Sequence, residues 1–256
     1  MILFVGAGPG DIELITVKGM KALNEADCVI YAGSLVNPRI IDAYCKKDVT
    51  VYNSAKMCLD EVIDVMIKME AEGKKVVRLH TGDPSIYGAI REQMDRLIEH
   101  KIEFDVIPGV SSFVAAASRL KEEFTLPSVS QTIIITRLPG RTGSGEGGKL
   151  EELAKHKASM AIFLSVQSIG NVIEKLKKSY SDNTPVAVVY KATWEDEKIV
   201  RGTLIDIEEK VHKASISRFA QILVGDFMAD KYSLSKLYDK GFSHMYRSPD
   251  AFEIVQ

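Results

Sequence analysis

The residues best suited to chemistry lie in three glycine-rich turns, each of which directly follows a short apolar run. These turns are residues 6–11, 80–85 and 108–112. Glycine has no side chain, so a ligand can come close to the backbone of such a turn. Turns that follow parallel strands gather at one edge of a sheet, where ligands bind in α/β proteins. Together the three turns predict a small-molecule site.

Two common nucleotide-binding motifs do not fit the first turn. Gly6 and Gly8 match the G-x-G-x-x-G fingerprint, but Asp11 stands at the third glycine position. The second predicted strand, 28–32, ends without the acidic residue that binds a ribose hydroxyl in that fold. No Gly-Lys-Ser/Thr follows the turn, so the Walker pattern also fails. A dinucleotide cradle is therefore not predicted.

The elements that must position these turns alternate between strand and helix up to about residue 120. The predicted strands are 2–5, 28–32, 49–52, 75–79 and 104–107. Helices are predicted after Thr16 (with an apolar stripe of Val17, Met20, Leu23 and Ala26), from Pro38, over 59–69, near Ile86, and around 115–117. As an alternative to ligand binding, Ser85, Ser111 and Ser112 are candidate helix N-caps. This alternation predicts an α/β domain on a mainly parallel sheet.

The pattern changes after about residue 125, where strands outnumber helices. Strands are predicted at 131–136, 160–164, 185–190, 198–204 and 220–224, and the alternation in 198–204 is typical of a strand near a sheet edge. The glycine-rich segment 139–148 is expected to be a flexible loop, either a lid or a connector. We predict two α/β domains, 1–122 with a mainly parallel sheet and 123–256 with a mixed sheet and a polar, aromatic tail.

Composition narrows the possible partners. The 256 residues carry a net charge of -2, so no general surface for nucleic acid or anionic membranes is expected, and an acidic substrate needs a local basic patch. Three cysteines without C-x-x-C spacing indicate reduced thiols in a cytoplasmic protein, and the five histidines form no zinc motif. No apolar run approaches the roughly 18 residues of a membrane span, and no signal peptide is recognised.

The combination of the three turns, with the second extended to Gly88, resembles the tetrapyrrole methylases, which use S-adenosylmethionine (SAM) in corrin and sirohaem synthesis. Further stretches resemble the branch of that family that acts on C11 of precorrin-4. They are residues 31–36, 131–137, 140–142 and 189–201. The resemblance covers Ile2 to about Arg247. Asp11 is followed by Ile12, where the family often has proline.

The resemblance implies two α/β domains with SAM in the cleft between them, S-adenosylhomocysteine as a product, and a homodimer. Carried over by position, the implied cofactor-binding residues are Pro9, Thr81, Gly82, Asp83, Ile86, Ser111, Ser112, Leu164, Ala192 and Ala220, with Gln221 beside the last. The glycine turn leaves space for the ligand, and helix N-termini suit the methionine carboxylate.

The implied substrate is a carboxylate-rich tetrapyrrole, and basic residues near the cleft are expected to receive its carboxylates. The substrate-binding candidates are Asp11, Ser34, Lys56, Arg137 and Arg141. Arg39 is a further candidate, for which a solvated surface charge is at least as good an interpretation. No metal ligand is assigned.

The reaction needs no acid/base pair, because a sulfonium methyl group already has a good leaving group and alignment can supply most of the rate. No catalytic residue is therefore assigned, although His80, Asp11 and Asp83 lie near the predicted site. The alternatives are a family member acting at another ring position, a class I Rossmann methyltransferase, and a non-catalytic SAM or tetrapyrrole sensor. Cobalt-loaded and metal-free substrates both remain open, and we favour the cobalt form.

Overall fold

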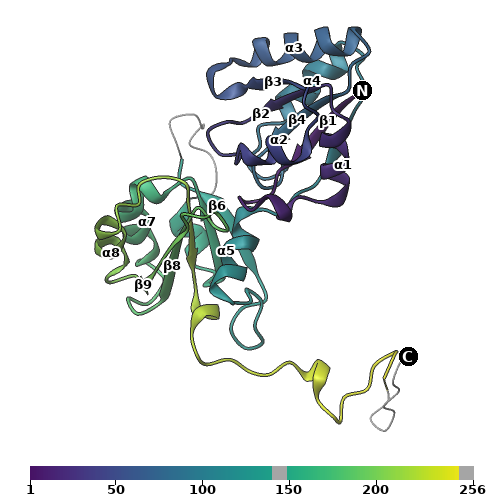
Figure 1. Ribbon diagram of the computed structural model, residues 1–256. Coiled ribbons are helices and arrows are strands. Elements are labelled where there is room, and N and C mark those ends of the chain that lie inside the picture. The colour runs from purple at the N-terminus through teal and green to yellow at the C-terminus, as the bar shows by residue number, and fades with distance from the viewer. Residues whose placement is uncertain (140–148, 248–256) are drawn as a thin grey trace.

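The computed structural model describes residues 1–139 and 149–247 and consists of two α/β units, each with a five-stranded sheet (Figure 1). The first sheet is entirely parallel and the second is mixed, as predicted from the sequence. The predicted loop 139–148 lies outside the described residues except for Pro139.

The first sheet has the strand order β3-β2-β4-β1-β5. Its strands are β1 (Ile2–Gly6), β2 (Cys28–Tyr31), β3 (Thr50–Asn53), β4 (Val76–His80) and β5 (Phe104–Ile107). Alternate side chains of a strand point to opposite faces, so β1 contributes Phe4 to one core cluster and Val5 to another. Both faces of this sheet are therefore covered.

Helices on the two faces complete these clusters. Helices α1 (Val17–Glu25) and α2 (Arg39–Tyr44) cover the face of Val5, whereas α3 (Leu59–Ala71) and α4 (Arg91–Glu99) cover the face of Phe4. Two 3₁₀ turns, η1 (Ile12–Leu14) and η2 (Ser54–Lys56), follow β1 and β3. The Thr16 hydroxyl caps α1, as predicted, by accepting a hydrogen bond of 3.1 Å from the Gly19 N–H.

Three local predictions were wrong. No helix begins near Ile86, because Tyr87 and Ala89 have φ angles of 55° and 50° and α4 starts only at Arg91. Ser85 is consequently not a helix cap, and its hydroxyl donates to Asp83 instead. Val17 does not belong to the buried stripe of α1, since it is 65% exposed.

The second sheet has the order β6-β7-β10-β8-β9, and only the β6–β7 pair is parallel. Its strands are β6 (Ile133–Arg137), β7 (Ser159–Phe163), β8 (Pro185–Tyr190), β9 (Lys198–Thr203) and β10 (Ala220–Val224). Strand β9 is at the edge, as predicted. Helices α6 (Leu150–Ala154), α7 (Ile169–Leu176) and α8 (Ile207–Lys213) share one core cluster with this sheet.

Helix α5 (Ser112–Leu120) covers the other face of the second sheet. Its small residues Ala115 and Ala116 are buried in a cluster with Ala161 of β7 and Leu223 of β10. The helix starts at the third glycine turn, which follows a strand of the first sheet, so it connects the two units. A domain boundary at residue 122 stays a prediction. Helix α5 precedes this boundary in the chain but packs on the second sheet.

The remaining 3₁₀ turns are η3 (Val166–Ser168), η4 (Asp226–Met228) and η5 (Lys236–Tyr238). Beyond η4, the chain extends away from the second unit (Figure 1). Within this extension one Arg247 nitrogen donates to the carbonyls of Leu237, Asp239 and Phe242, while Tyr238 and Tyr246 are exposed.

The three glycine turns meet at the carboxyl edge of the first sheet. The Ala7 N–H donates to the His80 carbonyl at 2.7 Å, and Gly8 pairs with Gly82 through two backbone bonds of 2.8 and 3.3 Å. A Cβ atom on Gly109 would lie 2.2 Å from the Gly82 carbonyl oxygen, and one on Gly6 would lie 2.6 Å from it. Only glycine allows this contact.

We expect Gly109→Ala to lower the free energy of unfolding by about 2–4 kcal/mol, because the new methyl group clashes with rigid backbone. Gly73→Ala is the matched control: Gly73 has φ +71° but nothing within 4 Å of the added Cβ. That change should cost only about 1 kcal/mol of backbone strain. Urea unfolding of both variants measures the difference, and equal costs would contradict a close contact at Gly109.

Candidate functional site

Asp83 links the second glycine turn to the third. Its Oδ2 accepts a hydrogen bond of 2.9 Å from the Gly109 N–H, and its Oδ1 accepts one of 2.8 Å from the Ser85 N–H. Burial would raise the pKa of Asp83, but hydrogen bonds from the Ser85 hydroxyl and the two backbone groups outweigh burial and lower it. An ionised Asp83 therefore holds the two turns in register.

A loop of the second unit, residues 190–197, lies against the first glycine turn. The Trp194 Nε1–H donates to the Pro9 carbonyl at 2.9 Å, and the Asp11 N–H donates to the Thr193 hydroxyl at 3.0 Å. A Cβ atom on Gly10 would lie 2.0 Å from the Trp194 ring. Glycine at this position thus lets the indole pack on the turn.

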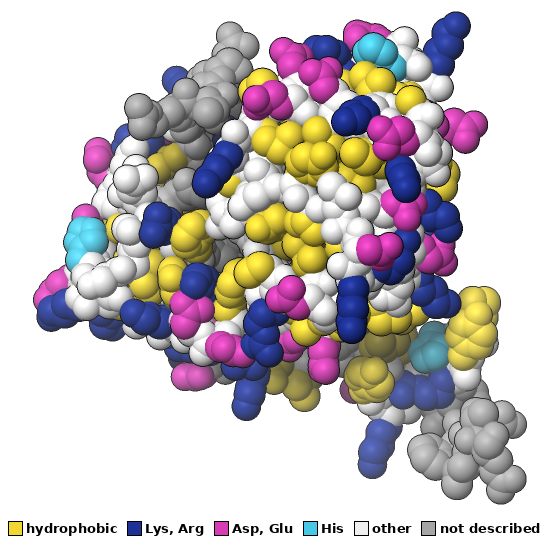
Figure 2. All heavy atoms as spheres, turned by 45° about the horizontal axis from the view of Figure 1, so that its top comes forward, with side chains coloured by type: hydrophobic (Ala, Val, Ile, Leu, Met, Phe, Trp, Pro, Cys, Tyr) yellow, Lys and Arg dark blue, Asp and Glu magenta, His cyan; other side chains and the backbone are white. Residues whose placement is uncertain are grey.

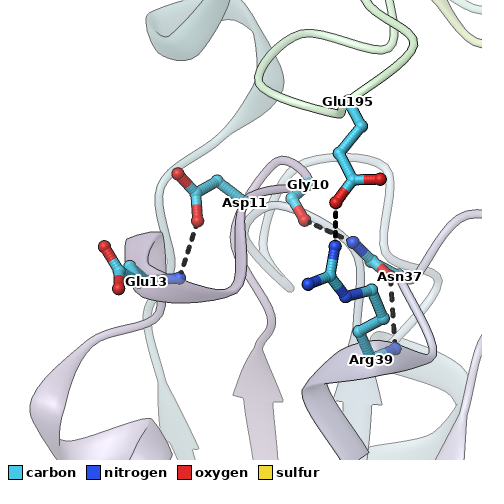
Figure 3. Close-up of polar contacts among 6 residues, drawn as sticks. All are labelled: Gly10, Asp11, Glu13, Asn37, Arg39 and Glu195. Atoms are coloured by element: carbon cyan, nitrogen blue, oxygen red, sulfur yellow. Dashed lines mark hydrogen bonds and ion pairs between the residues drawn. The ribbon is translucent and has the colours of Figure 1, made fainter. Parts of the chain in front are cut away.

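The start of α2 takes part in the same contact (Figure 3). The Asn37 side-chain amide donates to the Gly10 carbonyl at 3.0 Å, and Arg39 forms an ion pair with Glu195 of the second unit. Both charged side chains are exposed, so the pair adds little stability. Arg39 is therefore a surface charge used in a contact between the units.

Glu197 fixes the loop to α5. Its carboxylate accepts a hydrogen bond of 2.7 Å from the Thr193 N–H and two of 3.0 Å from Arg119 Nε–H. Glu197 is 11% exposed at its side chain. A continuous set of contacts consequently runs from Arg119 through Glu197 and Thr193 to Asp11.

Several residues around this junction have backbone conformations that are rare outside glycine. Tyr87, Leu164, Lys191 and Thr193 have φ angles of 55°, 50°, 46° and 71°. Such conformations cost of order 1–3 kcal/mol each and gather at functional sites. Leu164 is also 62% exposed, so its side chain is open to contact. These features fit a ligand wall.

The predicted cofactor-binding residues come from both units. Thr81, Gly82 and Ile86 lie in the second turn, while Ser111 is the N-cap of α5 with a side chain that makes no capping bond. Ser112 is the first residue of α5 rather than its cap, and its hydroxyl donates to Gln221 Oε1 at 3.2 Å. The predicted N-cap role of Ser112 is thus wrong, and its bond joins the third turn to β10.

The remaining cofactor candidates belong to the second unit. Ala192 is buried between Lys191 and Thr193, and Ala220 begins β10 opposite Tyr190. Together with Pro9 and Leu164 they lie in the turns and strand ends described above.

An aromatic contact joins the two units near the end of β6. The Tyr87 ring lies 5.1 Å from that of Phe163, and the Arg137 guanidinium lies 5.6 Å from the Tyr87 centroid. Arg137 is therefore placed beside Tyr87, which follows the second glycine turn. Neither aromatic residue was singled out from the sequence.

The other substrate-binding candidates are more dispersed. Ser34 and Lys56 are exposed, in the loop after β2 and in η2 after β3. Asp11 is exposed and accepts a hydrogen bond of 3.0 Å from the Glu13 N–H. Arg141 lies outside the described residues.

Charge is mixed over the face shown in Figure 2, where Lys and Arg side chains alternate with Asp and Glu. Across residues 1–139 and 149–247, no cluster of three or more His, Cys, Asp and Glu side chains is placed to hold a metal ion. None of the helices in these two ranges has the length and apolar character to traverse a bilayer. A cavity of about 350 Å³ between Met1, Ala22 and Lys74 lies at the opposite, amino-terminal edge of the first sheet.

Trp194 and Tyr87 were the important omissions from the sequence-based site. Trp194 is the one tryptophan of the chain and lies four residues beyond the end of β8, which could have marked it. Tyr87 gives no comparable signal, because its position depends on its left-handed backbone. Glu197 and Arg119 are ordinary charged residues in sequence and become visible only through their mutual contact.

His80 is the last residue of β4 and the first of the second turn, but it is unsuited to acid catalysis. It is buried, and burial together with the charge of Arg78 lowers its pKa to about 3. Its ring lies 6.0 Å from that of Phe4, on the face covered by α3 and α4. His80 is therefore neutral at physiological pH and packs beneath the turns.

This pKa predicts an acid dependence of stability. The pKa of His80 in the folded state lies below its unfolded value of about 6.5. The stability that goes with a neutral His80 is therefore fully present above pH 6.5 and is lost as the pH falls toward the folded pKa. Compared with the His80→Gln variant, the wild type should lose up to about 1.4 kcal/mol of unfolding free energy per pH unit in this window. Urea unfolding from pH 7 to 4 tests it, and parallel curves for the two proteins would contradict a buried neutral His80.

We expect Trp194→Phe to weaken the contact between the units, because the Pro9 carbonyl loses its donor. The loss should be about 1 kcal/mol, the usual net value of such a hydrogen bond. Tyr246→Phe, at an exposed aromatic residue of the tail, is the control. Thermal unfolding compares them, and equal midpoints would show that the indole N–H contributes nothing.

Known proteins resemble this chain over almost its whole length. A 59% identical relative, the cobalt-precorrin-4 C(11)-methyltransferase of Methanocaldococcus jannaschii, aligns over 96% of this chain and 95% of its own. The enzyme of the same name from Priestia megaterium is 46% identical over 96% of this chain and 97% of its own. The precorrin-4 C(11)-methyltransferase of Pseudomonas aeruginosa is 41% identical, over 96% and 98% of the two chains.

The fold has solved counterparts. The X-ray structure of a cobalt precorrin-4 methyltransferase, described as a cobalamin biosynthetic enzyme, superposes with a TM-score of 0.85 at 46% identity over 89% of this chain and 95% of its own. The uroporphyrin-III C-methyl transferase of Thermus thermophilus, solved with S-adenosyl homocysteine, shares the fold at a TM-score of 0.74 and 24% identity, over 88% and 97% of the two chains.

The family model for the tetrapyrrole (corrin/porphyrin) methylases matches residues 1–208. This match includes all three glycine turns and the loop that packs on them. The family identified from the sequence motifs is thereby confirmed: the chain belongs to the tetrapyrrole methylases.

Proposed function

We propose that this chain transfers the methyl group of SAM to C11 of cobalt-precorrin-4, giving cobalt-precorrin-5 and S-adenosylhomocysteine in cobalamin synthesis. The observation that carries the proposal is the 59% identity to a cobalt-precorrin-4 C(11)-methyltransferase over 96% of this chain. Two relatives with cobalt in their names are more similar to this chain than the 41% identical enzyme named without it. This order favours the cobalt-loaded substrate over the metal-free one.

A family member with another ring position is the main alternative. Methanocaldococcus jannaschii has a uroporphyrinogen-III C-methyltransferase that is 32% identical to this chain, against 59% for its cobalt-precorrin-4 enzyme. Within one organism, the chain is thus much nearer to the enzyme that acts at C11. A non-catalytic binding module is the other alternative, and a turnover assay separates it from an enzyme.

The residues at the junction suit SAM. Ser111 is only 7% exposed and its hydroxyl has no hydrogen bond to the rest of the described chain, which leaves it for a ligand. The first N–H groups of α5 lack partners within the helix, as in any helix, and favour a carboxylate. Leu164 and Ile86 supply apolar contacts. Thr81 and Gly82 supply backbone that a ligand can approach closely. Pro9, Asp83, Ser112, Ala192 and Ala220 complete the proposed set.

When bound, SAM supplies a methyl group on a positively charged sulfur, which a nucleophilic ring carbon can attack. The protein's contribution is to align the substrate and exclude water. Tyr87 and Phe163 offer ring faces to a flat macrocycle, and Arg137 beside them can pair with one of its carboxylates. Asp11, Ser34, Lys56 and Arg141 remain proposed substrate contacts, and no side chain is assigned as a base.

We also propose a cytoplasmic homodimer. The free thiols of Cys28, Cys45 and Cys58 are typical of a reducing compartment. The tail carries Leu234, Tyr238 and Met245 with most of their surface exposed, and an apolar extension of this kind suits burial against a second copy. Light scattering of the full chain and of a chain ending at Asp230 tests the role of the tail in assembly.

Product analysis tests the proposed function. Cobalt-loaded and metal-free precorrin-4 are each offered with ¹³C-methyl SAM, and the product is examined by mass spectrometry and NMR. The proposal expects one added methyl group at C11, S-adenosylhomocysteine in equal amount, and faster turnover of the cobalt form. A label at another carbon would favour a different ring position, and SAM binding without S-adenosylhomocysteine would favour a sensor.

Arg137→Ala should lower kcat/KM for the tetrapyrrole by about tenfold or more, because a charge-assisted carboxylate contact is worth roughly 1.5–3 kcal/mol. Arg137→Lys should recover only part of this, since an ammonium cannot form two parallel hydrogen bonds. Arg91→Ala, on the exposed side of α4, is the control. Steady-state kinetics at saturating SAM decide the matter; wild-type values for both Arg137 variants would remove Arg137 from the substrate site.

A further inference from the structure

A second polar cavity lies on the α3/α4 side of the first sheet, separate from the junction of the two units. It has a volume of about 190 Å³. Its walls come from η2, the first turns of α3 and α4, and β4, and they include Ser54, Cys58, Arg78, Glu92 and Gln93. None of the predicted SAM- or substrate-binding residues lines it.

Arg78 is the unusual member of this wall. It is 7% exposed, its Nε–H donates to Gln93 Oε1 at 3.0 Å, and one terminal nitrogen donates to the Ile30 carbonyl at 3.1 Å. No carboxylate of residues 1–139 or 149–247 forms an ion pair with it. The second terminal nitrogen has no hydrogen bond within the same ranges, and Arg78 is one of the residues that line the cavity.

A buried charge without a partner is costly, and buried charges in proteins are normally paired. Burial lowers the pKa of Arg78 to about 10, so the side chain still carries its charge at neutral pH. The two hydrogen bonds to neutral oxygens fix the guanidinium but leave its charge uncompensated. An arrangement of this kind is suited to an anion from outside the chain, because the planar guanidinium binds a carboxylate through two donors.

Glu92, also in the cavity wall, opposes such binding. It is exposed and forms no ion pair with Arg78, so water screens most of its effect. A carboxylate near it should bind less well than it would beside Arg78 alone. Removing the Glu92 charge should therefore improve carboxylate binding, and this expectation can be tested.

We propose that the cavity beside Arg78 is a binding site for a carboxylate group. The group could belong to a free small carboxylate or to a side arm of the tetrapyrrole substrate, and the second source rests on the proposed function. The cavity accommodates either, since a carboxylate with one or two methylene groups occupies much less than its volume. Gly88 and Ala89 of its wall come shortly after the second glycine turn in the chain.

Cys58 allows binding to be measured without turnover. It is exposed and lines the cavity, whereas burial raises the pKa of Cys28 and of Cys45 to about 11 and slows their reaction. We expect sodium acetate to slow alkylation of Cys58 in the full chain, with saturation on the order of millimolar. Sodium chloride at the same ionic strength should have no such effect. Peptide mass spectrometry identifies the alkylated cysteine.

The source of the carboxylate is decided by a second probe. If uroporphyrin, a stable tetrapyrrole polycarboxylate, protects Cys58 at concentrations at least about tenfold below acetate, the site holds a tetrapyrrole arm. Protection by acetate alone assigns it to a free small carboxylate. Protection by neither overturns the proposal. SAM is absent from this assay, so a lack of protection does not bear on the methyltransferase proposal. Likewise, a lack of methyl transfer does not affect the interpretation of protection by acetate.

Two variants connect the protection to the charges. Arg78→Met should abolish protection by both probes, and protection that survives in this variant overturns the proposal. Glu92→Gln, at an exposed position, should retain the fold and bind acetate about threefold more tightly, because a repelling charge is removed. Unchanged or weaker binding in Glu92→Gln overturns the proposal even if Arg78→Met fails to fold.

Discussion

The Gly82 carbonyl oxygen, packed against Gly6 and Gly109, is the contact on which the candidate site depends. Added Cβ atoms on these two glycines would approach this oxygen to 2.6 and 2.2 Å, so side chains would force the turns apart. With the turns together, Asp83 can accept the Gly109 N–H, and the start of α5 is fixed beside the second turn. The loop of the second unit depends on the same turns, because Trp194 packs on Gly10 and donates to Pro9.

Helix α5 transmits this arrangement to the second unit. Its first residue is bonded to Gln221 of β10, its alanines pack on the second sheet, and Arg119 near its end holds Glu197. Glu197 in turn orients Thr193, whose hydroxyl accepts the Asp11 N–H of the first turn. The two units are thus joined at both ends of one helix, and Ser112 of the proposed SAM-binding residues belongs to this set of contacts. A site assembled from two units can tighten on a bound ligand through a small relative movement.

Much of this could be predicted from the sequence, because strand periodicity and glycine-rich turns are local signals. The five parallel strands and the meeting of the three turns follow from runs such as 75–79 and from the rule that parallel strands end at one edge. Features that depend on distant contacts were missed. Nothing in the composition of residues 83–90 reveals the left-handed backbone at Tyr87 and Ala89 that delays α4 to Arg91. Ser112 was predicted as a possible cap, but Gln221, 109 residues away, determines its bond. Arg78 was part of a predicted strand and drew no notice, since its burial depends on α3 and α4.

The central claim is that one ligand site is formed by the second and third glycine turns and the loop 190–194 together. Hydrogen–deuterium exchange of the full chain with and without S-adenosylhomocysteine tests it most directly. The account predicts slower exchange in peptides covering 81–86, 110–115 and 190–194 of the same sample, with α8 and β9 unchanged. Protection confined to one of the two units, or protection centred on α8 and β9, would contradict a shared site at their junction.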